Sequence, residues 1–364
     1  MAALTKTRTR LPFLDWMRGL AAVIMIQGHT FHSLARPETR QDSPYVLSQF
    51  FGGIAPAVFL FLTGITFAFS IERSSQRDAT IRSRILAALK RSRYLFTLAV
   101  LFRLQLWVFA YPQSSWTDLF RVDILNCMGF TMLLLAPMAI FQTQQRARMC
   151  ALAGAAIAAL SPVISSLDWG WLHPYLSAYV VPSYNYFSFF PWAAFLAFGM
   201  SAGTVLRMVR QEQMNLLMQW ATLLGFGLVL GGHYFSSLPY SLYTKSEFWL
   251  NSPALIVEKL GVVLLAAAFA FLWTEHFTLG AWSWLRQMGT TSLIVYWVHI
   301  EIVYGRWFGS WKQNLSTGQC VVFEIVLLAA MLGLSVARTR WNGIQIRAWL
   351  PAWYAPMPRR VSGD

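Results

Sequence analysis

The chain has 364 residues, of which 56% are hydrophobic and 16% aromatic, while only 12% are charged. A soluble globular protein carries about 25% charged residues, so this composition excludes a water-soluble surface and indicates one that faces lipid. The net charge of +14 would suggest nucleic-acid binding in a soluble protein. Here the positive charges lie between apolar runs, so we expect no nucleic-acid partner.

Ten apolar runs follow one another along the chain, and each is close to the roughly 20 residues that a helix needs to cross a bilayer. The runs are 14–34, 54–71, 94–111, 119–141, 149–167, 187–206, 214–235, 254–273, 288–305 and 319–337. No linker of soluble-domain size separates them. The sequence therefore predicts an all-α polytopic membrane protein with about ten transmembrane helices, in which residues 1–364 form a single domain.

The distribution of Lys and Arg predicts the orientation. With a cytoplasmic N-terminus, the inner segments hold 20 of the 29 Lys and Arg residues and the outer loops hold five. Because cytoplasmic loops carry the excess of positive charge, we expect both termini to be cytoplasmic. We interpret the first run as a retained helix rather than a cleaved signal peptide, and we expect a multi-pass protein of a bacterial plasma (inner) membrane.

Polar side chains within the runs are the first indication of a functional site. A charged side chain inside a bilayer costs about 2.5–3.5 kcal/mol on insertion scales, so it usually faces the protein interior. The expected topology places nine such residues near the outer ends of their helices, which predicts a polar cavity open toward the outer side. They are His29, His32, Asp123, Asn126, His233, Glu258, Lys259, His299 and Glu301. Arg103 lies near mid-membrane and needs a partner, for which Asp123 is a candidate.

Three segments carry a family resemblance. The stretch LDWMRGLAAVIMIQGH (14–29) has the Arg18-Gly19 pair near its start and His29 eleven residues after Arg18. It resembles the first-helix signature of transmembrane acyltransferases, both the heparan-α-glucosaminide N-acetyltransferase-like family and the acyltransferase-3 family. The segments 52–70 and 288–305 are similar to later helices of the first of these families.

The resemblance implies transfer of an acyl group, usually acetyl from cytoplasmic acetyl-CoA, to a hydroxyl or amine of a sugar or glycolipid on the outer side. The expected partners are the lipid bilayer, acyl-CoA and that acceptor, and a homo-oligomer or a membrane-complex partner stays open. The three cysteines show no Cys/His spacing typical of a metal site, so we predict no metal.

The chemistry needs a base or nucleophile, and a histidine serves as either. We assign this role to His29, with His32 as the alternate and His299 as a further catalytic candidate. Asp123, Glu258 and Glu301 are candidates for the carboxylate that fixes the imidazole tautomer, and the sequence does not choose among them. We expect the substrate-binding residues to be Asn126 and Lys259 as donors to the oxyanion, Glu301, and Arg18 with the basic segment 73–93 on the donor phosphates.

Structural explanations compete with several of these assignments. Arg18 could simply extend to the interface, the basic segment fits the positive-inside rule, and Gly52, Gly53 and Gly64 suit close helix packing. His299 and Glu301 point about 200° apart on an ideal helix, so both cannot face one site. The alternative functions are a proton-coupled transporter or flippase and a non-catalytic membrane-complex subunit that binds haem through two histidines.

Overall fold

The computed structural model describes residues 11–77, 80–278 and 281–341, and these form helices and their connections without a β-sheet. Within these residues, seven helical segments are long and apolar enough to cross a membrane: Ser43–Ser75, Trp116–Ile140, Thr143–Ser166, Phe189–Met208, Gln211–Ser236, Pro253–His276 and Thr317–Trp341. The prediction of an all-α membrane protein is confirmed. The count of about ten spans and the cytoplasmic placement of both termini stay predictions.

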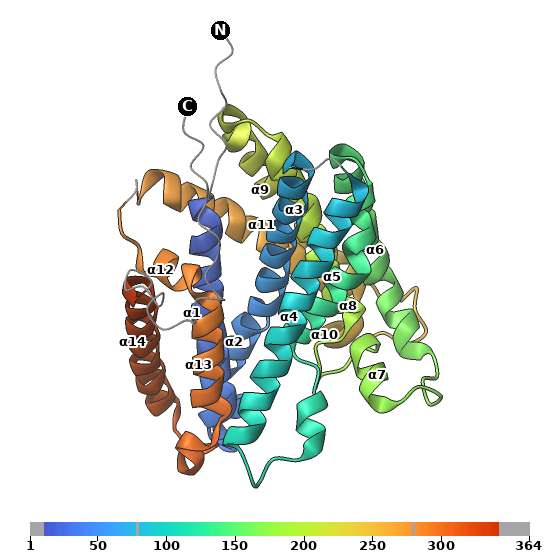
Figure 1. Ribbon diagram of the computed structural model, residues 1–364. Coiled ribbons are helices and arrows are strands. Elements are labelled where there is room, and N and C mark those ends of the chain that lie inside the picture. Colours follow the sequence, from blue (N-terminus) through green and yellow to red (C-terminus); the bar gives the residue numbers. More distant parts are fainter. Residues whose placement is uncertain (1–10, 78–79, 279–280, 342–364) are drawn as a thin grey trace, which may run out of the picture.

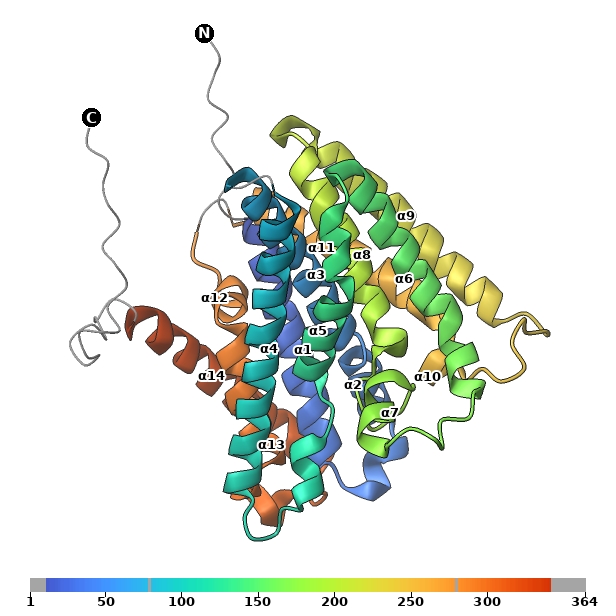
Figure 2. The same cartoon turned by 45° about the vertical axis from the view of Figure 1, so that its right-hand side comes forward.

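A helix lies at each of the ten predicted runs (Figure 1). The ten are α1 (Pro12–Leu34), α3 (Ala55–Arg77), α4 (Ile81–Phe109), α5 (Ile124–Leu135), α6 (Thr143–Ser166), α8 (Phe189–Met208), α9 (Met214–Ser236), α11 (Pro253–His276), α13 (Ser292–Tyr304) and α14 (Thr317–Trp341). Shorter helices join them: α2 (Ser43–Gly52), α7 (Pro174–Val180), α10 (Phe248–Asn251) and α12 (Trp284–Thr290). Figure 2 shows the long helices packed side by side as one bundle.

Helix α4 begins at Ile81, well before the predicted start at residue 94. Thr80 caps its N-terminus by accepting a hydrogen bond from the Ser83 amide at 3.3 Å, as Thr commonly does at this position. The first turns of α4 are rich in Arg and Lys, so a search for apolar runs misses them. The predicted basic loop 73–93 is therefore mostly the end of α3 and the start of α4.

Two predicted runs are interrupted. In 119–141 the α-helix starts only at Ile124, because the Asp123 carboxylate accepts hydrogen bonds from the first free amides of α5. It ends at Leu135, where Pro137 opens a 3₁₀ turn, Ala136–Ile140. In 288–305 the backbone leaves the helical region at Thr291 (φ −119°, ψ 19°), which separates α12 from α13.

Glycines set the closest helix crossings. A Cβ at Gly64 would lie 2.1 Å from the carbonyl oxygen of Leu196, and one at Gly199 would lie 2.0 Å from that of Phe61, so α3 and α8 pack backbone to backbone. The predicted packing role of Gly64 is confirmed. A similar approach between Gly28 and Gly52 brings α2 against α1, one residue before His29.

The outward faces of α9 and α14 are apolar and exposed. Leu223, Leu224 and Leu230 on α9 and Ile325 and Val326 on α14 are all more than half exposed. Exposing these apolar side chains to water would be unfavourable, whereas contact with lipid tails is not. These helices therefore present the lipid-facing surface that the composition predicts.

Candidate active site

Two imidazoles from opposite ends of the sequence meet between α1 and α13. The His29 Nδ1 atom lies 3.0 Å from the His299 Nε2 atom, and the two rings lie edge to edge in nearly one plane, with centroids 5.3 Å apart and an interplanar angle of 7°. His299 is fully buried, whereas His29 is half-buried. The pair lies toward the C-terminal ends of α1 and α13, at the predicted outer end of the bundle.

The hydrogen bonds of His299 determine the tautomers of both rings. His299 Nδ1 lies 2.8 Å from the Val295 carbonyl oxygen, and because a carbonyl only accepts, Nδ1 carries the proton. In the neutral ring Nε2 is then the acceptor, so His29 Nδ1 must donate to it. The Nε2 atom of His29 is left with a free lone pair, which is the form a general base or nucleophile requires.

Tyr304 and His32 flank this pair. The Tyr304 ring meets His29 edge to face with centroids 5.3 Å apart, and its hydroxyl lies 3.1 Å from His32 Nδ1. His32 is exposed and lies three residues after His29 on the same face of α1. Tyr304 is not among the residues predicted from the sequence, although a tyrosine at the end of the helix that carries His299 is a usable signal.

Asp123 and Asn126 lie in a second cluster, between α4 and α5. Asp123 Oδ2 is 3.0 Å from Arg103 Nε, which confirms the predicted partner of Arg103. Asp123 Oδ1 caps α5 by accepting from the backbone amides of Leu125 and Asn126, and it also accepts from the Asn126 side-chain Nδ2 at 3.2 Å. The Asn126 side-chain oxygen accepts from the Tyr179 hydroxyl; burial and the Asp123 charge raise the pKa of Tyr179, which keeps it a donor.

Tyr296 packs between the rings of His299 and Phe102. Its ring lies 5.9 Å from the His299 ring, measured between centroids, and 5.2 Å from that of Phe102. The carboxylate of Asp123 contacts Arg103 and the start of α5, and the partner of His29 is His299. The position that a carboxylate takes in a catalytic triad is filled here by His299.

Glu301 faces the other side of α13 from His299, as their angular separation predicts. Its two oxygens accept from Gln105 Nε2 at 2.6 Å and from Trp307 Nε1 at 2.9 Å. Gln105 in turn accepts from Trp297 Nε1 at 2.7 Å. The sequence analysis missed Gln105, whose signal is a lone amide within the apolar run of α4.

Glu258 and Lys259 lie apart from the histidine pair, on α11. Glu258 Oε1 is 4.0 Å from Nδ1 of His233 on α9, whose ring is 80% exposed. The Lys259 ammonium lies 5.3 Å from the centroid of the Trp192 ring and faces Gly53 at the α2–α3 junction. Among the described residues, Lys259 has no carboxylate within ion-pair distance.

Arg18 is at the opposite end of α1, where it pairs with Asp15 at 3.0 Å. The structure therefore brings together His29, His299 and His32 and distributes the other predicted residues over separate clusters. The sequence predicted that these side chains share one polar cavity at the outer end. In the structure they instead form separate groups, each between a different pair of helices. In the described part of the chain, no group of three or more His, Cys, Asp or Glu side chains could hold a metal ion.

The fold and site define an integral membrane protein: a helical bundle with a buried imidazole pair at one end. Residues 10–243 match the family model described as heparan-alpha-glucosaminide N-acetyltransferase, catalytic, and the chain belongs to this family. Membership indicates a membrane acetyltransferase. The matched region contains His29 and Asp123 but ends before α13, which carries His299. A comparison with curated proteins gives no significant match.

Proposed function

We propose that this protein transfers an acetyl group from cytoplasmic acetyl-CoA to a hydroxyl or amine of a sugar or glycolipid on the outer side of the membrane. The observation that carries the proposal is the His29–His299 hydrogen bond at 3.0 Å. It leaves one imidazole nitrogen unprotonated in a chain that belongs to an acetyltransferase family.

His29 acts as the general base. Its Nε2 atom takes the proton of the acceptor while the acceptor oxygen or nitrogen attacks the thioester carbon. The tetrahedral intermediate collapses as the carbon–sulfur bond breaks, and the departing CoA thiolate takes the proton from the His29 imidazolium. His299 stays neutral throughout and accepts the hydrogen bond from His29 Nδ1, so it holds the ring in one tautomer and one orientation.

The remaining predicted residues support this step from outside the histidine pair. Lys259 is half-buried and has no carboxylate partner in the described chain, so its charge is available to an oxyanion. Arg18 lies at the inner end of α1, where CoA phosphates would arrive. Asp123 and Asn126 hold α4 and α5 together through Arg103 and the start of α5, and Glu301 fixes α13 against α4.

A radiolabelled acetyl-CoA assay tests the proposal. Purified protein in lipid vesicles is given labelled acetyl-CoA and glucosamine, and both thioester loss and label transfer are measured. We expect His29→Ala to lower transfer by about 10²–10⁴-fold, and His276→Ala to leave it unchanged because His276 is exposed at the end of α11. Equal rates in wild type and His29→Ala would remove His29 from the mechanism. Acetyl-CoA supplied to one side of the vesicles and glucosamine to the other tests sidedness.

A further inference from the structure

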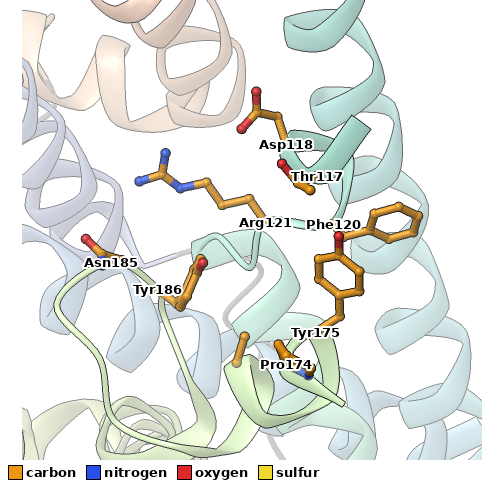
Figure 3. A pocket seen from close by; sticks show the side chains of 9 residues that line it. Thr117, Asp118, Phe120, Arg121, Pro174, Tyr175, Asn185 and Tyr186 are labelled. Atoms are coloured by element: carbon orange, nitrogen blue, oxygen red, sulfur yellow. The ribbon is translucent and has the colours of Figure 1, made fainter. Parts of the chain in front are cut away.

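A pocket of about 300 Å³ opens at the predicted outer end of the bundle, between the 3₁₀ helix Trp116–Phe120, the start of α7 and the connection that follows α7 (Figure 3). This volume is at the lower end of the range for small-molecule sites, ~300–1,000 Å³, so the pocket suits one small polar group. The lining residues that carry the inference are Thr117, Asp118, Phe120, Arg121, Tyr175 and Asn185.

The pocket lies at the level of the lipid headgroups. The 3₁₀ helix Trp116–Phe120 begins the segment Trp116–Ile140, which is long and apolar enough to cross a membrane. Aromatic side chains next to the lining residues are strongly exposed, since Trp116 is 69% and Tyr184 is 68% accessible. Trp and Tyr gather at the membrane–water interfaces, at headgroup level. A phospholipid headgroup is therefore the small polar group that this pocket meets most often.

The pocket holds two opposite charges that do not pair with each other. Among the described residues, neither the Asp118 carboxylate nor the Arg121 guanidinium has a partner within ion-pair distance. The two residues are three positions apart at the end of a 3₁₀ helix, and side chains with this spacing lie on the same face of such a helix. A carboxylate and a guanidinium that line one pocket without pairing suit a ligand that carries both charges.

The oxygens of the lining suit a primary ammonium group. Asp118 uses Oδ2 to accept from the Ser115 amide at 3.1 Å, which leaves Oδ1 as an acceptor. The Thr117 hydroxyl donates to the Ser115 hydroxyl at 2.9 Å, so its oxygen keeps a lone pair, and the Asn185 side chain offers a carbonyl oxygen. A primary ammonium has three N–H donors for these acceptors. A trimethylammonium has none and would cover the oxygens without pairing them, which is unfavourable.

Aromatic rings and Arg121 supply the remaining contacts. The Phe120 and Tyr175 rings have centroids 5.0 Å apart and a tilt of 33°, and Phe120 is 56% exposed, so its face is open to a ligand. Aromatic faces attract cations. Figure 3 shows the Arg121 side chain extending away from these two rings, and a guanidinium binds phosphate through paired hydrogen bonds. The pocket thus has a side for an ammonium and a side for a phosphate.

We propose that this pocket binds the zwitterionic headgroup of phosphatidylethanolamine, with the ammonium at Asp118 and the phosphate at Arg121, while the acyl chains stay in the bilayer. Phosphatidylglycerol has no cation for the Asp118 carboxylate, and phosphatidylcholine lacks the N–H donors. A bound headgroup joins the 3₁₀ helix to the connection that follows α7, so it stabilises the folded chain. The inference goes beyond the proposed acetyl transfer and stands without it.

Native mass spectrometry measures the binding of single lipids. The full-length protein is kept in a polyoxyethylene detergent and titrated with phosphatidylethanolamine, phosphatidylcholine and phosphatidylglycerol that carry the same acyl chains. We expect wild type to bind phosphatidylethanolamine about fivefold more tightly than either of the other lipids, since each of them leaves one polar or charged group of the pocket without a partner.

Two variants each remove one charge from the pocket. We expect Asp118→Asn and Arg121→Gln each to weaken phosphatidylethanolamine binding about tenfold, because each removes a charge-assisted hydrogen bond. The amide oxygen in Asp118→Asn can still accept from the Ser115 amide, so the 3₁₀ helix keeps its cap. The matched controls are Asp168→Asn and Lys245→Gln, since both residues are exposed and lie outside the pocket lining. Asp168 also accepts from one backbone amide, and both controls should leave the affinity unchanged.

Equal affinities of wild type for the three lipids would overturn the inference, as would a preference for phosphatidylethanolamine that both pocket variants retain. Binding of soluble glycerophosphoethanolamine without any preference among the lipids would overturn the membrane source of the ligand. Thermal unfolding in detergent without lipid checks the folding of each variant. Added phosphatidylethanolamine should then raise the unfolding temperature of wild type more than that of Arg121→Gln, and an equal rise would also count against the pocket.

Discussion

Two buried polar clusters at the predicted outer end of the bundle use their hydrogen-bonding groups differently. In the α4–α5 cluster, Asp123 meets Arg103 with one oxygen and caps α5 with the other, and Asn126 is held at both ends of its amide. In the α1–α13 cluster, His299 uses both ring nitrogens but His29 uses only one. The groups of the α4–α5 cluster pair with one another, whereas the α1–α13 cluster keeps a free lone pair on His29.

This difference separates a structural role from a chemical one. Buried polar groups are normally paired inside the protein, and a cluster whose groups pair with one another has little left to offer a substrate. The Nε2 atom of His29 keeps its lone pair in a half-buried position, where a substrate can use it. Variants of the two clusters should therefore fail in different assays.

The largest effect is expected for His29. In His29→Ala the general base is lost, and we expect the acetyl-transfer rate to fall by about 10²–10⁴-fold, while the unfolding temperature stays close to that of wild type because the side chain is only half-buried. Initial rates with labelled acetyl-CoA and a thermal unfolding curve measure the two quantities on one preparation. A large drop in unfolding temperature with an unchanged rate per folded molecule would reverse the comparison.

The Arg103–Asp123 pair should show the opposite pattern. Arg103→Leu leaves the Asp123 carboxylate buried without its cation, and breaking such a pair costs about 3–5 kcal/mol. We expect a marked loss of stability in denaturant unfolding, and a rate per folded molecule within a few-fold of wild type. The double variant Arg103→Leu/Asp123→Asn removes the stranded charge and should recover part of the stability. A rate collapse at wild-type stability would instead place Asp123 in the chemistry.

The helices were largely predictable because hydropathy reports a property of each run by itself. The predicted start of α1 differs from the observed start by two residues, and that of α9 agrees. The errors in helix boundaries arise where a local hydrogen bond or a backbone turn overrides the hydropathy pattern. The Asp123 cap delays α5, the Thr80 cap advances α4 into a basic segment, and the backbone turn at Thr291 divides what reads as one run.

The site was predictable only in part. The resemblance of the first helix singled out His29, whose catalytic role stays a prediction, and depth along the helices put His299 at the same end of the bundle, where it contacts His29. However, the depth of a residue along its helix does not say which neighbouring helix its side chain faces. Glu301 therefore faces α4 and Glu258 faces α9, while Asp123 belongs to its own helix cap. Pairwise contacts such as His29 with His299 depend on packing between segments 270 residues apart.

Variants of His299 test whether the free Nε2 lone pair of His29 depends on the hydrogen bond between the two rings. His299→Ala removes the acceptor of His29 Nδ1–H, so the ring is free to change tautomer and orientation, and we expect the rate to fall about 10–100-fold. His299→Gln retains a side-chain oxygen that can accept this hydrogen bond and should recover most of the rate. The ¹⁵N shifts of His29 report its tautomer in each variant. An unchanged tautomer in His299→Ala would show that His299 does not position His29.

The smallest effect is expected for the Tyr304 hydroxyl. Tyr304→Phe keeps the ring against His29 and removes only the hydrogen bond to the exposed His32, a bond of a kind that contributes about 0.5–1.5 kcal/mol. The rate should fall by a few-fold at most, and Tyr304→Ala, which also removes the ring, should cost more. If Tyr304→Phe instead lowered the rate a hundredfold, the hydroxyl would have to pass a proton. The α1–α13 cluster would then include Tyr304 as a catalytic residue, with His32 as its partner.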